Sequence, residues 1–309
     1  MAAQPKAQTR IVKSGNGHSY LLDGQPVPGV TTILSNGVPK PGLIGWGAGT
    51  VADFVVNRLN VARNAEGKAR IVADDLVRDA IAWNATRGHN AVKVGNDELP
   101  RLALADILKN IRYRDLDEAS NRGTEVHTFG ERLARGEEVI VPPELEGHVL
   151  SYVRFLDEWQ PTNAILEGVT VNRRWGYMGK FDMIAEFPDR TWVDGPWAGK
   201  PVGRGLLDIK TSRSGIFAEV ALQLEAYRQG ETILSGKDEV PMPEIDWVGA
   251  IWVRTDGYDV HVFNTDESTF RTFLYIKQVG EWLDWKTGKA ATIKSDSITV
   301  PAHDNGAPK

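Results

Sequence analysis

The sequence predicts a mixed α/β (α+β) fold, in which a mostly helical N-terminal region is followed by strands that alternate with helices. Between residues 50 and 118, apolar residues recur every three or four positions, which is the spacing of amphipathic helices. Between residues 164 and 187, and again between 247 and 263, apolar and polar residues alternate as in half-buried strands. The segment GLLDIKTS, residues 205–212, adds an apolar run of strand length.

The composition narrows the class of protein. Hydrophobic residues make up 41% and charged residues 25% of the 309 residues, as is usual for a folded globular chain. No apolar run approaches the ~20 residues of a membrane span, and the first residues lack the apolar segment of a signal peptide, so we expect a cytoplasmic protein with no membrane partner. The chain has no cysteine, which excludes disulfides, thiol nucleophiles and cysteine-bound zinc or iron–sulfur clusters.

Turn and loop signals dominate the N-terminal segment. Asp23-Gly24 predicts the turn of a short hairpin, and the Pro/Gly-rich stretch 37–49 predicts a loop before the helices of residues 50–118. The glycines of that stretch do not form a phosphate-binding loop, because no Gly-Lys-Ser/Thr follows them. The net charge of −5 disfavours nonspecific coating of nucleic acid but is compatible with a local basic groove.

A helix is predicted from about residue 119 to Gly136, with Val126, Phe129 and Leu133 as its apolar stripe and glycine as its C-terminal stop. His127 borders the stripe among small residues, which allow another element or a ligand to approach the imidazole. The alternative is a half-buried histidine bonded to a backbone carbonyl. A second helix is predicted around residues 150–159.

A hairpin is predicted next, with strands over 164–175 and 177–187 and a turn at Gly176. In the first strand, Glu167 should share a face with Val169 and Val171. In the second strand, Asp182 is a lone acid between apolar neighbours, for which a solvated strand face is the alternative reading. The loop 188–204 is either an ordered flap or a plain insertion.

The segment GLLDIKTS carries two charged residues in an aliphatic strand. Asp208 and Lys210 point to one face, and Leu207 and Ile209 to the other. Because buried charges are costly unless paired or ligated, the two charges form either a private salt bridge or the edge of an active site. The helix predicted over 214–234 places Gln223 and Tyr227 on one face, since they are four residues apart.

Four short motifs follow one another along these elements. They are GxxxH from Gly123 to His127, GxxD from Gly179 to Asp182, DxK from Asp208 to Lys210, and QxxxY from Gln223 to Tyr227. In this order, and on these helices and strands, they resemble the RecB-like exonuclease branch of the PD-(D/E)XK nuclease superfamily. The CRISPR-associated RecB-like exonucleases and their bacteriophage relatives are the most similar members. One motif alone is weak, whereas four in order are specific.

The resemblance covers residues 119–262 and implies a restriction-endonuclease-like core of helix, three strands, helix and strand. We therefore expect an N-terminal hairpin and helical region over 1–118, a nuclease core over 119–290 and a loose C-terminal tail over 291–309. The chain departs from the CRISPR-associated members, which hold an iron–sulfur cluster on four cysteines. No iron–sulfur cluster is expected here.

The resemblance also implies a metal site. His127, Asp182 and Asp208 would bind Mg²⁺ or Mn²⁺ through their side chains, and Ile209 through its backbone carbonyl. Lys210 would orient or help to deprotonate the attacking water and stabilise the developing charge. Magnesium takes oxygen ligands, and manganese also accepts imidazole. Asp182, Asp208 and Lys210 are thus the expected catalytic residues.

The remaining candidate residues have weaker signals. By the same resemblance, Gln223 and Tyr227 count with the catalytic residues and would contact the scissile phosphate or the DNA backbone, although either could be ordinary helix surface. Glu167 is a candidate outer-sphere residue. Three basic residues near the hairpin turn could receive DNA phosphates or be solvated loop charges: Arg173, Arg174 and Lys180.

The expected function is that of a metal-dependent DNA exonuclease in phage or bacterial recombination, repair or replication, working in the host cytoplasm if phage-encoded. Its partner would be DNA, as single strands or duplex ends, with a recombination or helicase partner in addition. The motifs are equally compatible with a structure-specific endonuclease, a hydrolase of another phosphate ester or a catalytically inactive DNA-binding protein of the same fold.

Overall fold

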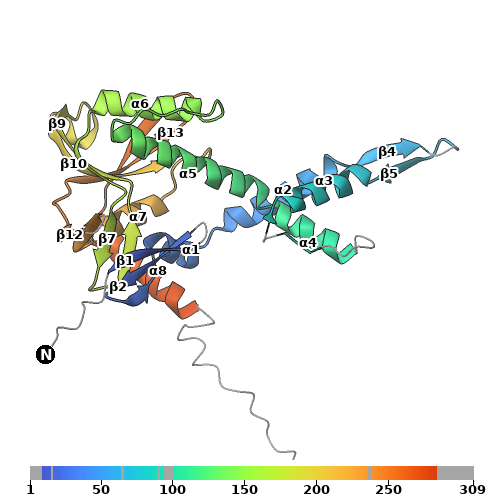
Figure 1. Ribbon diagram of the computed structural model, residues 1–309, viewed down its shortest axis with the longest axis horizontal. Coiled ribbons are helices and arrows are strands. Elements are labelled where there is room, and N and C mark those ends of the chain that lie inside the picture. Colours follow the sequence, from blue (N-terminus) through green and yellow to red (C-terminus); the bar gives the residue numbers. More distant parts are fainter. Residues whose placement is uncertain are drawn as a thin grey trace, which may run out of the picture.

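The computed structural model describes residues 9–283, apart from residues 15–16, 64–65, 89–90, 94–100 and 236–237. The chain forms a mixed α/β core from which an arm projects to one side (Figure 1). The helix α5 (Arg114–Ala134) runs from the arm into the core. In the described part of the chain, no helix is long and apolar enough to cross a bilayer.

The core is built on a five-stranded sheet with the order β14-β13-β10-β9-β6. Its strands are β6 (Thr162–Leu166), β9 (Met183–Thr191), β10 (Pro201–Lys210), β13 (Trp247–Val253) and β14 (Tyr258–Phe263). Strands β10 and β13 are parallel, and the other neighbours are antiparallel. The strand predicted around GLLDIKTS is therefore confirmed, and it lies in the middle of the sheet.

Successive residues of β10 serve the two faces of this sheet. Leu207 and Ile209 pack against α6 (Glu146–Trp159), whose Tyr152 and Phe155 belong to the same cluster. Leu206 packs on the opposite face, in the cluster formed with α1 (Val30–Gly37), α7 (Glu219–Arg228) and α8 (Glu267–Leu283). Because side chains alternate along a strand, Asp208 and Lys210 share the face of Leu206, beside α7.

A second sheet of four strands has the order β12-β11-β7-β8. Its strands are β7 (Val169–Asn172), β8 (Tyr177–Lys180), β11 (Thr232–Ser235) and β12 (Asp238–Pro241). The predicted hairpin is present, with Gly176 in its turn at a φ of 61°. Its two strands, however, each cross from one sheet to the other.

The crossing occurs at a bend where the backbone pairing of the two strands continues. Glu167 N–H donates to the Asp182 carbonyl at 2.9 Å, and Phe181 N–H donates to the Gly168 carbonyl at 2.9 Å. Glu167 has a φ of 56°, a strained value for a residue with a side chain. The predicted single face of Glu167, Val169 and Val171 is therefore wrong, because the bend turns Glu167 away from the two valines, which pack under β2.

The N-terminal hairpin packs against the core. Its strands are β1 (Arg10–Ser14), β2 (Gly17–Leu22) and β3 (Gln25–Val27), with the predicted turn at Asp23-Gly24. Tyr20 and Leu22 share a cluster with β7 and β8, and Val30 of α1 is fully buried under the central sheet. These segments therefore pack with elements that lie beyond residue 118.

The arm consists of α2 (Pro41–Val56), the hairpin β4 (Asn60–Arg63) and β5 (Ala69–Val72), α3 (Asp74–Ala85) and α4 (Arg101–Ile111). It has a small hydrophobic cluster of its own, formed by Phe54, Leu76, Ala80, Ile107 and Ile111. The predicted loop 37–49 is wrong from Pro41 onward, where α2 begins with proline in its first turn. The prediction that residues 50–118 are mostly helical did not include β4 and β5, whose β-branched residues favour strands.

The predicted helices differ from the observed ones mainly at their ends. Helix α5 begins at Arg114, five residues before the predicted start, and Gly136 follows its end at a φ of 76°. Helix α7 is shorter than the predicted 214–234, because Gly230 packs against Thr170 and the chain then enters β11.

Candidate active site

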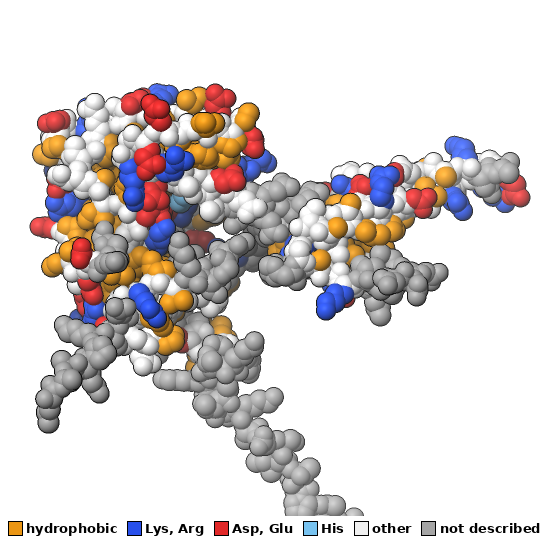
Figure 2. Space-filling view, in the orientation of Figure 1, with side chains coloured by type: hydrophobic (Ala, Val, Ile, Leu, Met, Phe, Trp, Pro, Cys, Tyr) orange, Lys and Arg blue, Asp and Glu red, His pale blue; other side chains and the backbone are white. Residues whose placement is uncertain are grey.

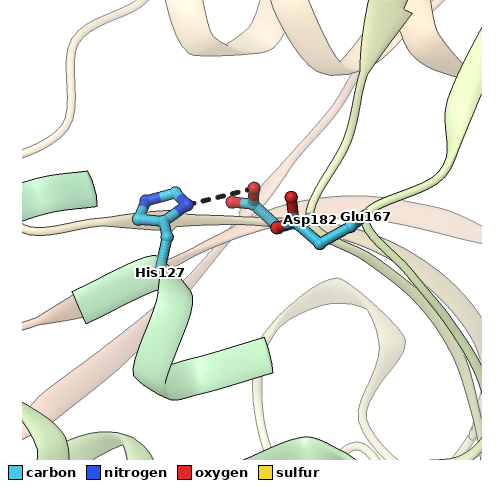
Figure 3. Close-up of side chains that lie close together, drawn as sticks. All are labelled: His127, Glu167 and Asp182. Atoms are coloured by element: carbon cyan, nitrogen blue, oxygen red, sulfur yellow. Dashed lines mark hydrogen bonds and ion pairs between the residues drawn. The ribbon is translucent and has the colours of Figure 1, made fainter. Parts of the chain in front are cut away.

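The predicted site residues meet where the bent hairpin, the end of β10, α5 and α7 come together. Glu167 and Asp182 lie on the two strands of the bend, and His127 reaches them from α5 (Figure 3). Asp208 and Lys210 lie at the end of β10, beside Gln223 of α7. Five elements distant in sequence thus contribute to one site.

Asp182 is held by two donors. His127 Nδ1 donates to Asp182 Oδ1 at 3.1 Å (Figure 3), and the backbone N–H of Ile209 donates to Asp182 Oδ2 at 2.6 Å. The imidazole nitrogen that faces Asp182 is Nδ1, so Nδ1, once it has lost its proton, is the nitrogen placed to bind a cation together with Asp182. Ile209 thus meets the site through its N–H, and its carbonyl as a metal ligand stays a prediction.

Three side chains offer ligand atoms to one cation. One ligand atom from each of His127, Glu167 and Asp182 lies within 4.8 Å of the others. An imidazole with two carboxylates suits Mn²⁺ well, and the carboxylates also suit Mg²⁺. The donor set therefore fits the divalent cation that the resemblance implies. Glu167, predicted as an outer-sphere residue, belongs to this set by position.

His127 and Asp182 shift each other's pKa values. Burial alone would lower the pKa of His127, but the adjacent Asp182 carboxylate outweighs it and raises this pKa above its ordinary value of 6.5. Burial would raise the pKa of Asp182, but the imidazole and the Ile209 N–H outweigh it and lower this pKa. Each group thus favours the charged form of the other.

A second network joins Asp208, Lys210, Gln223 and Tyr227. The Lys210 ammonium forms an ion pair with Asp208 Oδ2 and donates to Gln223 Oε1 at 3.3 Å. Gln223 Nε2 donates to Asp208 Oδ1 at 3.1 Å and to the Tyr227 hydroxyl at 2.9 Å. One glutamine therefore contacts the acid, the lysine and the tyrosine.

Asp208 and Lys210 contact each other as an ion pair. The contacts to a metal and a phosphate that the resemblance implies for them stay a prediction. Asp208 is 3% exposed, and burial, together with the Asp182 charge, raises its pKa despite Lys210. Burial would lower the pKa of Lys210, but Asp208 outweighs it and keeps the ammonium charged.

Tyr227 is buried beneath the network, where Gly179 leaves room for its ring. A Cβ at Gly179 would lie 2.5 Å from Tyr227 Cε1 and 2.7 Å from a methyl of Val30. The glycine of the GxxD motif is thus required for packing rather than for its backbone angles. The Tyr227 hydroxyl also contacts Thr31 of α1, a residue that no sequence signal connected to the site.

Small residues likewise let α5 approach the sheet. A Cβ at Gly130 would lie 3.2 Å from Tyr152 and 3.4 Å from the Ile209 side chain, and one at Gly123 would lie 3.4 Å from Thr211. This close approach is what brings the His127 imidazole to the bend, as the small neighbours of His127 predicted.

The three candidate DNA-binding residues near the hairpin turn differ in their surroundings. Arg173 is bound by Asp23 and Glu239, which raise its pKa and join the N-terminal hairpin to β12. The Arg174 side chain lies over the Trp175 ring. Lys180 forms an ion pair with Glu167, and so it belongs to the metal-binding side of the site.

Figure 2 shows acidic and basic side chains gathered on the visible face of the core, beside a histidine. No protein-family model matches the chain, and no curated protein sequence matches it. The functional argument therefore depends on the residues and their geometry.

Proposed function

We propose that the chain is a divalent-metal-dependent deoxyribonuclease of the PD-(D/E)XK superfamily, and specifically a RecB-like exonuclease. The observation that carries the proposal is the proximity of His127, Glu167 and Asp182 to the Asp208–Lys210 pair. An acid-rich cation site next to a charged lysine is what phosphodiester hydrolysis requires. The order α5, α6, β6 to β10, α7 and β13 supports the proposal if β6 with β7, and β8 with β9, each count as one bent strand of the expected helix, three strands, helix and strand.

The residues divide into two roles. A divalent cation held by the imidazole and carboxylates supplies positive charge against the negative charge that develops on the phosphoryl oxygens. Lys210 is charged, so it acts by stabilising this developing charge and orienting water. Gln223 fixes the Lys210 ammonium and the Asp208 carboxylate relative to each other. Tyr227 holds Gln223 from below.

The test is digestion of end-labelled linear duplex, single-stranded DNA and closed circular DNA with Mg²⁺ or Mn²⁺, with chelator as the blank. The variant Asp182→Asn should abolish cleavage, because it removes a ligand charge and the partner of His127. Asp189→Asn is the matched control, since Asp189 is an exposed residue of the same strand.

Release of nucleotides from linear DNA only would support exonuclease action. Cleavage of closed circles would favour the endonuclease alternative. Binding of DNA without cleavage under any of these conditions would identify an inactive DNA-binding protein and contradict the proposal.

A further inference from the structure

We propose that the arm hairpin, residues 60–72, is a contact surface for duplex DNA at a distance from the catalytic site. This inference rests on the proposed function and adds to it a binding surface outside the nuclease core. It is carried by three features of the hairpin: an exposed apolar pair, an excess of basic residues and a fixed connection to the site.

The hairpin exposes an apolar pair. Strands β4 and β5 pair antiparallel, with Val61 directly opposite Ile71. Each of these side chains is 70% exposed, and Arg63 lies on the same face, two residues further along. A lone two-stranded hairpin is marginally stable in water, and exposed apolar pairs of this kind mark contact surfaces.

The base of the hairpin is nevertheless held firmly. Arg58 donates from Nε to Asp79 at 2.9 Å and from Nη1 to the Phe54 carbonyl at 3.2 Å, with its guanidinium 3.8 Å from the Phe54 ring centroid. Asn60 Nδ2 donates to Asp75 at 2.5 Å. These contacts fix the hairpin to α2 and α3, so it projects in a defined direction from the end of the arm (Figure 1).

The charge of the hairpin is opposite to that of the chain. Residues 60–72 contain three basic residues and one acid, in a protein with a net charge of −5. Arg63, Lys68 and Arg70 are exposed; Arg63 donates from Nη1 to the Gly67 carbonyl at 3.0 Å, and Lys68 forms an ion pair with Glu66 at 3.5 Å. A segment with this charge attracts a polyanion and repels a second copy of itself, which argues against a homodimer contact through this surface.

The shape of the hairpin also favours duplex DNA. The major groove admits a two-stranded β-ribbon, whose apolar side chains can contact base edges while basic side chains contact phosphates. Val61 and Ile71 would face the groove, and Arg63, Lys68 and Arg70 would reach the phosphates. Such binding is largely independent of sequence, as a nuclease of broad substrate range requires.

The arm connects this surface to the site helix. Lys40, next to the start of α2, forms a 2.7 Å ion pair with Glu219 in the first turn of α7, the helix of Gln223. The 16 residues of α2 span about 24 Å, and the short strands of the hairpin add about 13 Å. A duplex that contacts both surfaces must therefore extend roughly 10 base pairs beyond the site, at about 3.4 Å per base pair.

The experiment measures DNA binding by fluorescence anisotropy, in chelator, over a range of salt. The duplexes have about 8 and about 24 base pairs, so that only the longer one spans both surfaces. The test variant is Arg63→Gln with Lys68→Gln and Arg70→Gln. The control variant makes the same change at three exposed arginines of the core: Arg135, Arg154 and Arg271.

For the longer duplex, we expect the slope of log affinity against log salt to decrease by about 2 to 3 in the hairpin variant, since each phosphate contact contributes about 0.9. We expect no such change for the short duplex or in the control variant. Val61→Ser with Ile71→Ser should weaken binding of the longer duplex and leave the salt slope unchanged. Equal slopes for wild type and the hairpin variant on the longer duplex would overturn the inference.

Two further outcomes separate this inference from the proposed function. If the wild type neither binds nor cleaves DNA, the proposed function itself fails. If it cleaves both duplexes and the hairpin variants match it in binding and cleavage, the nuclease proposal stands and the hairpin inference fails. A concentration-dependent oligomer in sedimentation that Val61→Ser with Ile71→Ser dissolves would instead assign the hairpin to a protein contact.

Discussion

Replacing Lys180 by methionine should strengthen the binding of Mn²⁺. Lys180 forms an ion pair with Glu167, and Glu167 is one of the three side chains positioned to hold the cation. A cation that takes the Glu167 carboxylate must therefore compete with the Lys180 ammonium. Methionine keeps most of the side-chain volume and removes the competitor.

The expected gain in Mn²⁺ affinity follows from how far the Lys180–Glu167 ion pair is exposed to solvent. The Lys180 side chain is 39% exposed and that of Glu167 is 17% exposed, so the pair is screened by solvent on the lysine side. Pairs of this kind stabilise by about 1 kcal/mol at most, which corresponds to a roughly fivefold gain in Mn²⁺ affinity. Loss of the neighbouring positive charge acts in the same direction.

The assay is calorimetric titration of Mn²⁺ into protein freed of metal by chelator. Lys200→Met is the matched control, because it removes one exposed lysine in the loop between β9 and β10 and should leave the affinity unchanged. Glu167→Gln should weaken Mn²⁺ binding, since it removes a charged ligand. Unchanged or weaker binding by Lys180→Met would refute the assignment of Glu167 as a ligand in competition with Lys180.

Three further changes have expected outcomes. Gly179→Ala should lower the free energy of unfolding by about 1–3 kcal/mol in urea titrations, because its Cβ would overlap Tyr227; an unchanged midpoint would contradict that packing. Gln223→Ala should slow DNA cleavage in single-turnover assays while leaving Mn²⁺ affinity intact, since it removes positioning of Asp208 and no ligand; abolished metal binding would show a direct role. Acid should weaken α8 in the wild type but not in Asp266→Ala. Hydrogen bonds from Ser268 and from Thr269 lower the pKa of Asp266 from 3.8 to about 2, so its stabilising effect is present above pH 3.8 and lost as the pH falls through 2; equal acid-induced loss of helical circular dichroism in both proteins would exclude this role.

The sequence correctly predicted those helices and strands whose apolar residues recur at a regular spacing. The helices α5 and α6 and the strand β10 have strong local patterns, and the structure confirms each of them. The bend at Glu167 could not be predicted, because alternation with a period of two continues through it while the backbone turns. The position of Glu167 beside His127 and Asp182 depends on that turn, so the sequence placed Glu167 at the edge of the site rather than in it.

Packing explains the other differences. The glycines of α2 indicated a loop, because glycine is a poor helix former, but the packing of Phe54 of α2 against Ile107 and Ile111 of α4 stabilises a helix there. The contact of Thr31 with Tyr227 joins segments nearly two hundred positions apart, which no local pattern encodes.

The charges of the candidate site suggest how binding events would be linked. Each of its three acids has its own cationic partner: Glu167 with Lys180, Asp208 with Lys210, and Asp182 with His127. A divalent cation bound to the carboxylates would replace these cationic partners. The ammonium groups of Lys180 and Lys210 would then lie beside the cation without a carboxylate partner. A phosphate is then their natural counterion, because it brings negative charge to the position that the carboxylates gave up. Under the proposed function, cation and substrate would therefore each favour the binding of the other by the same factor, as linkage requires, and the ion pairs of Glu167 and Asp208 would be the state of the site before either binds.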